Sequence, residues 1–168
     1  LDGWLPPDVP EEYDICCLAL QEVQPLTGMN AVTTDVTRGR KWKEHIEATL
    51  GGGQTYACIC ARQMVGILLL CFVRHEHEPA VSELMMADAG TGIMRSGGNK
   101  GGVAARFRLY DKTLSFVSCH LAAHDHNGVA DVGPRRTKLI DAVVVCVEEE
   151  HHFVTKISDA LFATGVNI

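Results

Sequence analysis

The sequence predicts an α+β fold in which a β-sandwich is flanked by helices. Apolar runs of strand length outnumber the segments with helical periodicity, which is typical of layered α+β domains. Hydrophobic residues make up 46% of the chain and charged residues 21%, as in ordinary globular proteins. The 168 residues show no repeat and no low-complexity linker, so residues 1–168 are expected to form one domain.

The first half of the chain is expected to begin with irregular backbone and then a buried strand. Three prolines interrupt residues 1–13, which favours a loop or the end of a helix. Residues 15–20 are a continuous apolar run and predict a strand buried on both faces. Residues 40–50 predict a short amphipathic helix that the glycines 51–53 end. The residues expected on the apolar side of this helix are Trp42, His45, Ile46, Ala48 and Leu50.

The second half is dominated by predicted strands. These strands are expected at residues 55–61, 64–73, within 81–94, and at 102–109 and 113–121, where the last two form a hairpin. Residues 75–78, His-Glu-His-Glu, are interpreted as a solvated turn. A second helix is expected to begin at Pro134, and a last strand at residues 159–164. The apolar face of that second helix would comprise Leu139, Ile140, Val143, Val144 and Val147.

The seven cysteines are interpreted as reduced thiols of the core. They include the adjacent pair Cys16 and Cys17 and the C-x-C pair Cys58 and Cys60, and most lie in strand-like apolar runs. No apolar run approaches the roughly 20 residues that a membrane-spanning helix needs, and residues 1–4 do not resemble a secretory signal. These features predict a cytoplasmic location.

The charge is distributed unevenly along the chain. The net charge is −6, yet residues 95–138 hold eight basic residues against three acids. A focused positive cleft on an acidic body suits a small phosphorylated ligand. Extended nucleic-acid binding needs a broad basic face, so no nucleic-acid partner is expected.

Two neighbouring segments carry the candidate chemistry. Residues 96–107 form a glycine-rich turn with Asn99 and Lys100, followed by a strand, and residues 118–124 place His120 at the end of the next strand. An amide, an ammonium and an imidazole at strand ends suit an anionic ligand. Lys100 is followed by Gly rather than Ser or Thr, so the turn is not a Walker A loop. The spacing His120, His124, His126 suggests zinc, but neither H-x-H-x-D-H nor H-E-x-x-H is present.

The segments GNKGGVAARF at residues 98–107 and SFVSCHLAAH at residues 115–124 resemble the inositol polyphosphate 5-phosphatases. These are Mg-dependent members of the exonuclease–endonuclease–phosphatase superfamily. Residues 13–22, 63–73 and 91–94 are similar to further segments of the family in the same order, so the resemblance covers roughly residues 11–145. It implies a partial sandwich of that superfamily and removal of the 5-phosphate from inositol polyphosphates or phosphoinositides. If the substrate is a phosphoinositide, the expected partner is a peripheral membrane surface, at the cytosolic face of membranes.

The resemblance assigns roles to particular residues. Glu22 would hold Mg²⁺, while Asn99 and Lys100 would bind substrate phosphates. His120 would donate to the scissile phosphate and so act, with Glu22, as a catalytic residue. Further residues in or near matching motifs are His124, Arg135 and Arg136 on the substrate side and Asn167 on the metal side. By residue type alone, Glu22 could be a solvated carboxylate, Lys100 part of an exposed turn and His120 an ordinary core histidine.

The sequence also departs from the family. Gly165 is followed by Val166, so the Asp of the family's Gly-Asp-x-Asn motif is missing, and there is no Ser-Asp-His-x-Pro motif and no opening Trp-Asn-x-Asn strand. The 168 residues alone are therefore expected to have little or no phosphatase activity. Two alternatives stay open: a catalytically inactive phosphoinositide-binding module or fragment, and another superfamily member of the apurinic endonuclease or sphingomyelinase type.

Overall fold

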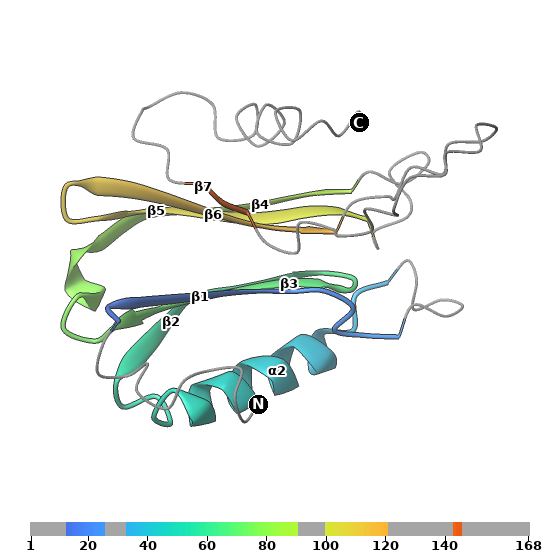
Figure 1. The fold of residues 1–168 in the computed structure, drawn as a ribbon, viewed down its shortest axis with the longest axis horizontal. Helices are drawn as coiled ribbons and strands as arrows, with labels where there is room; N and C mark the ends of the chain where they lie inside the picture. The colour runs from blue at the N-terminus through green and yellow to red at the C-terminus, as the bar shows by residue number, and fades with distance from the viewer. Residues whose placement is uncertain (1–12, 26–32, 91–99, 121–142, 146–168) are drawn as a thin grey trace, which may run out of the picture.

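The computed structural model describes residues 13–25, 33–90, 100–120 and 143–145. Its elements in chain order are β1 (Ile15–Leu20), α2 (Val36–Thr49), β2 (Tyr56–Met64), β3 (Ile67–Arg74), the 3₁₀ turn η2 (Glu78–Ala80), β4 (Val81–Gly90), β5 (Gly101–Leu109), β6 (Lys112–His120) and β7 (Val143–Val145). The strands form two antiparallel sheets, ordered β1-β3-β2 and β4-β5-β6-β7. Figure 1 shows these sheets stacked, with α2 against the outer face of the first. The predicted α+β sandwich is confirmed.

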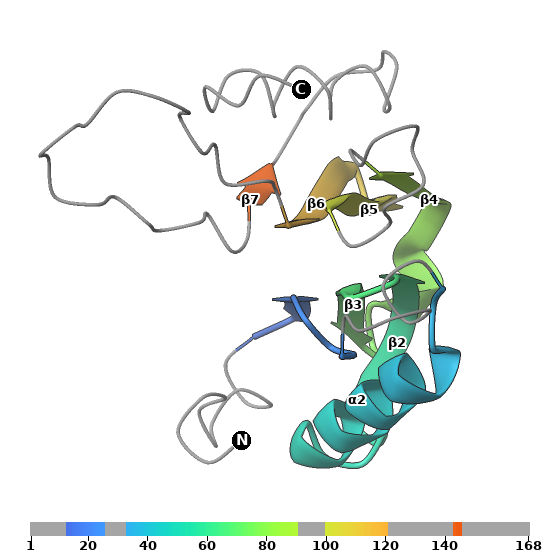
Figure 2. The ribbon, with the colours of Figure 1, turned by 90° about the vertical axis from the view of Figure 1, so that its right-hand side faces the viewer.

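The first sheet is covered on both faces. Every residue of β3 except Arg74 is buried, because the strand lies centrally between β1 and β2. Along β1, Cys16, Leu18 and Leu20 face the cluster under α2, whereas Ile15 and Cys17 face the cluster between the sheets. This alternation confirms that β1 packs on both faces, and Figure 2 shows its sheet between α2 and the second sheet.

Two apolar clusters hold the three layers together. Ile46 and Leu50 of α2 pack with Phe72 on the outer face of the first sheet. Val73 of β3 and Phe107 of β5 lie in the cluster between the sheets. Each such side chain is at most 1% exposed, and burying it contributes about 1.5–3 kcal/mol. The core therefore positions the strand ends at which the candidate residues lie.

The helix begins four residues earlier than predicted. The carboxylate of Asp35 accepts a hydrogen bond of 3.0 Å from the amide of Thr37 and caps the helix, so α2 starts at Val36. Of the predicted apolar side, Ile46 and Leu50 are buried and Trp42 is partly buried, but His45 and Ala48 are exposed. That part of the prediction was wrong because the helix contacts the sheet through Trp42, Ile46 and Leu50, which are four residues apart. His45 and Ala48 lie outside this row. Gly51 to Gly53 all have positive φ and end the helix as predicted.

The strand bounds also differ from the predicted ones. β2 runs to Met64, which pairs with Ile67, so the two-residue turn is Val65–Gly66 rather than the segment before Met64. The β5–β6 hairpin is confirmed, with Leu109 opposite Lys112. The long β4 lies within the interval predicted for a strand. A continuous apolar sequence does not by itself show where one buried strand ends and the next begins, because both are apolar.

The predicted second helix is wrong where the structure describes it. Val143 and Val145 lie in β7, paired with Val117 and Ser115 of β6. Three consecutive β-branched residues favour extended backbone, and β6 offers a free edge for pairing. The rest of that predicted helix, the strand predicted at residues 159–164 and the loop predicted at 1–12 lie outside the described residues.

The cysteines of the described residues are free thiols: Cys16, Cys17, Cys58, Cys60, Cys71 and Cys119. All are buried or partly buried, which confirms the expected core role for these six. Burial raises the pKa of Cys58 and of Cys119 to about 11, so both stay protonated at neutral pH. Within the described ranges, α2 is too short and too polar to cross a bilayer, and no other helix there could do so.

Candidate functional site

Three strand ends meet at one end of the sandwich. β1 ends at Leu20 and leads into Gln21 and Glu22, β5 begins directly after Lys100, and β6 ends at His120. Because β5 and β6 are antiparallel, Gly101 lies opposite His120. Segments that are about 20 and 80 residues apart in sequence thus arrive at the same edge of the fold.

Lys100 and His120 are in direct contact. The distance from Lys100 Nζ to His120 Nε2 is 2.6 Å, and the imidazole is only 4% exposed. An ammonium group only donates hydrogen bonds, so in this contact Nε2 is the acceptor. The pair therefore places the ammonium of Lys100 beside a buried imidazole at the strand ends.

Gly101 explains how Lys100 reaches this position. The residue has φ +144°, and a Cβ there would lie 2.0 Å from the carbonyl oxygen of Ala89 in β4. Only glycine fits this close approach between β4 and β5. Gly101 is therefore required by the packing of the strand that carries Lys100.

Gln21 joins the two sheets at this end. Its side-chain amide donates a hydrogen bond to the carbonyl of Cys119, from the residue that follows β1 of one sheet to β6 of the other. Glu22 and His120 each follow one of the two bonded residues directly, so this bond brings their backbones together. In the sequence, Gln21 belongs to the segment 13–22 that resembles the family, but it was assigned no role, because its distant partner Cys119 carries no local pattern.

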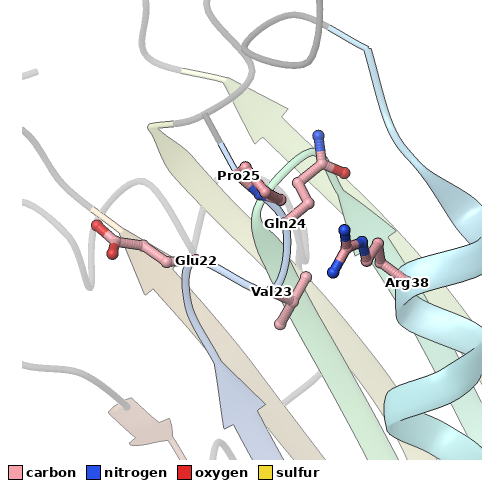
Figure 3. Close-up of a pocket in the computed structure, with 5 residues that line it drawn as sticks. All are labelled: Glu22, Val23, Gln24, Pro25 and Arg38. Carbon is pink, nitrogen blue, oxygen red and sulfur yellow. The ribbon is translucent and has the colours of Figure 1, made fainter. Parts of the chain in front are cut away.

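Glu22 is exposed and has φ +54°, a conformation that non-glycine residues adopt rarely. It lines an open hollow of about 390 Å³ together with Val23, Gln24, Pro25 and Arg38. Figure 3 shows its carboxylate pointing away from Arg38 and α2. The hollow lies on the α2 side of the loop, and neither Lys100 nor His120 lines it.

A hydrogen-bonded network holds the loop after Glu22. The amide of Val23 donates to the carbonyl of Gly66 at 3.1 Å. The side chain of Gln24, 3% exposed, donates to the carbonyl of Thr33 at 2.8 Å and accepts from the amide of Asp35 at 2.8 Å. Such buried polar contacts stabilise one loop conformation. Gln24 was also missed from the sequence, since a polar residue in a loop is expected to be solvated.

The remaining predicted site residues lie outside the described residues: Asn99, His124, Arg135, Arg136 and Asn167. Within the described part, the fold brings Lys100 and His120 into contact and ties the backbone before Glu22 to the backbone before His120. Of the two predicted metal ligands, Glu22 is the one that lies within the described residues. An exposed carboxylate on a well-held backbone fits a hard cation, since Mg²⁺ takes one or two carboxylates and keeps several waters.

Comparison with known proteins places this geometry in a family. The model of endonuclease/exonuclease/phosphatase family 2 matches residues 1–165. The chain belongs to this family. The match spans nearly the whole chain and agrees with the sandwich and with the resemblance found in the sequence.

Individual relatives show which members of this family the chain is similar to. The chain is 37% identical over 111 residues to the type II inositol 1,4,5-trisphosphate 5-phosphatase of Mus musculus, covering 66% of the chain and 11% of that protein. It is 35% identical over 119 residues to the type II inositol polyphosphate 5-phosphatase 15 of Arabidopsis thaliana, again covering 66% of the chain and 11% of the relative. The chain therefore spans about a tenth of the length of these relatives.

A solved structure agrees with the sequence relatives. The inositol polyphosphate 5-phosphatase domain of SpSynaptojanin, in complex with inositol (1,4)-bisphosphate and a calcium ion, superposes with a TM-score of 0.58 at 31% identity. The superposition covers 70% of this chain and 34% of that one. The similarity to 5-phosphatase catalytic domains and the α+β fold class are thereby confirmed.

Proposed function

We propose that this chain is part of a Mg-dependent phosphomonoester hydrolase that removes the 5-phosphate from inositol polyphosphates or phosphoinositides. The observation that supports this most directly is the contact between Lys100 and His120 beside the strand end of Glu22. Relatives at 35–37% identity carry the name 5-phosphatase, which favours this chemistry over that of endonucleases or sphingomyelinases.

Substrate binding would rearrange the Lys100–His120 pair. A phosphate dianion is a stronger acceptor than an imidazole, so the ammonium of Lys100 would turn from Nε2 to a phosphate oxygen. His120 would then take up a proton from solvent at Nε2 and donate a hydrogen bond to the scissile phosphate. Both groups would thus place positive charge where the transition state gathers negative charge. Asn99, next to Lys100 in sequence, would add a neutral donor.

Glu22 would hold the cation. A bound Mg²⁺ supplies charge neutralisation at the phosphoryl oxygens. The chain's own contribution would be to hold the Glu22 backbone in place through Gln21 and the Gln24 network. We place the protein in the cytoplasm, at the cytosolic face of membranes when the substrate is a lipid, and expect no nucleic-acid partner.

The test combines binding and turnover. In the longest natural polypeptide that contains this chain, we expect Mg-dependent phosphate release from inositol 1,4,5-trisphosphate. Lys100→Met and His120→Gln should lower the rate by about 100-fold or more, as expected for loss of a transition-state donor. Lys112→Met, at the far hairpin turn, is the matched control and should change little.

The alternatives predict different results. Binding of inositol 1,4,5-trisphosphate without phosphate release, in a polypeptide with all metal ligands, would identify a non-catalytic binding module. Cleavage of abasic DNA or of sphingomyelin would identify another superfamily activity. Rapid turnover by the 168 residues alone would overturn the expectation that the missing aspartate and Asp-His pair are needed.

A further inference from the structure

A second group of possible metal ligands lies at the opposite end of the sandwich. Asp14 directly precedes β1, and Glu76 and His77 lie between β3 and η2. One ligand atom from each residue lies within 4.8 Å of the others. The six residues of β1 separate this group from the Glu22 end, a distance of about 20 Å at 3.3 Å per residue. The group therefore does not belong to the candidate phosphate site.

The imidazole of His77 is held in a defined orientation. Its Nδ1 lies 2.7 Å from the hydroxyl of Tyr110, in the turn between β5 and β6. Its Nε2 faces Asp14, with 3.2 Å to Oδ1, and the side chain is only 22% exposed. The Tyr110 ring also packs edge-on against the imidazole. A histidine that binds a metal through one nitrogen commonly has the other held by a polar neighbour, and this arrangement supplies such a neighbour.

The donor set distinguishes this group from ordinary surface acids. One nitrogen and two carboxylates suit a first-row transition ion such as Zn²⁺ or Mn²⁺, whereas Mg²⁺ prefers oxygen alone. The side chains of Asp14 and Glu76 are 66% and 61% exposed, which leaves positions for water ligands. Arg74 now neutralises Glu76 at 2.8 Å, so an arriving cation would replace the guanidinium as the partner of this carboxylate.

From this arrangement we propose that Asp14, Glu76 and His77 bind a divalent first-row transition ion at a site separate from the Glu22 site. The ion would join the start of β1 to the β3–β4 connection, and Tyr110 would extend this link to the second sheet. A ligand that binds only the folded state stabilises it. The bound ion would therefore hold together the end of the sandwich that lies farthest from the proposed catalytic residues.

The site can be located by paramagnetic line broadening. Mn²⁺ titrated into the metal-free chain should broaden amide signals most strongly around residues 14–15, 76–78 and 110. A separate calorimetric titration with Zn²⁺ should show a saturable site whose affinity falls at least tenfold in His77→Gln and in Asp14→Asn. His45→Gln is the matched control, since His45 is an exposed histidine on α2 and should leave the affinity unchanged.

Further variants separate the possible outcomes. Tyr110→Phe keeps the ring but loses the hydroxyl, and should weaken binding several-fold without unfolding the chain. Glu22→Gln should leave this site intact, which makes the result independent of the proposed phosphatase function. The proposal is overturned if Mn²⁺ broadens no signals near residue 77, or if His77→Gln and His45→Gln bind Zn²⁺ equally. In either case Asp14 and His77 form an ordinary polar contact without a metal.

Discussion

At one end of the sandwich Lys100 contacts the buried imidazole of His120. At the other end the partly exposed His77 lies close to the carboxylates of Asp14 and Glu76. The same strands connect both places: β1 lies between Asp14 and Glu22, and β5 lies between Lys100 and the Tyr110 turn. At the first end, the Lys100–His120 pair suits an anion because its charged group is an ammonium. The second suits a cation because its charged groups are carboxylates. One antiparallel framework thus supports opposite chemistry, depending only on which residues flank the strands.

Removing the shared core should damage both ends together, with the largest effect on stability. Phe107 of β5 is fully buried and stacks on Phe116 with ring centroids 5.8 Å apart. Phe107→Ala should lower the free energy of unfolding by about 3–5 kcal/mol, measured by urea denaturation. Phe107→Leu keeps most of the volume and should cost less. A loss below about 1 kcal/mol for the alanine variant would mean that this core does not support the strands.

Breaking the bond between the sheets should affect the anion end selectively. Gln21→Met keeps the length of the side chain but leaves the Cys119 carbonyl without this donor, so the free energy of unfolding should fall by about 1–3 kcal/mol. NMR signals of Lys100 and His120 should shift, while those of His77 and Tyr110 stay in place. Gln54→Met, at an exposed position, is the control. Equal shifts at both ends would refute a local role for Gln21.

Removing the cap of α2 should lower stability by a smaller amount. Asp35 also bonds through its amide to Gln24, so the loop after β1 should be affected as well. Asp35→Ala removes the acceptor for the Thr37 amide, and the free energy of unfolding should fall by about 1 kcal/mol. Asp35→Asn retains a capping oxygen and should be nearly neutral. If thermal denaturation gives the same loss for both variants, the carboxylate charge rather than the cap is responsible.

Loss of the Tyr110 hydroxyl should have the smallest effect and should be confined to the cation end. Tyr110→Phe removes one exposed hydrogen bond to His77, so stability should fall by only about 0.5 kcal/mol. The His77 ring signals should move, whereas the His120 signals should not. Tyr13→Phe, also an exposed tyrosine, provides the comparison. A change at His120 would show that the two ends are coupled.

Much of the fold could be predicted from local sequence patterns. These predictions held where contacts between distant segments did not favour a different conformation. The apolar run of β1 and the β5–β6 hairpin around Tyr110 were predicted close to their observed positions. Val143 and Val144 of β7 were assigned to a helix face because their spacing from Leu139 and Ile140 fits one, yet pairing with β6 decided their conformation. The start of α2 was missed since the cap at Asp35 outweighed the apolar pattern further along.

The site was predicted in part. Lys100 and His120 were expected to face one anion, and they are in contact. Residues 75–78 were interpreted as a solvated turn, but His77 is partly buried between Asp14 and Tyr110. The sequence could not indicate this, because its partners lie about 60 residues before it and 30 residues after it. Gln21 was given no role for a similar reason, since its partner Cys119 lies 98 residues away.

By itself, the sequence determined the layered α+β class, the membership suggested by the 98–107 and 115–124 segments, and the types of side chain available at each strand end. These follow from local periodicity and residue chemistry, which need no knowledge of distant contacts. Only the tertiary structure decided that Gln21 bonds to Cys119, that Gly101 packs against Ala89 and that Asp14 lies beside His77. Such contacts depend on how two sheets stack, and stacking is set by the whole core rather than by any single segment.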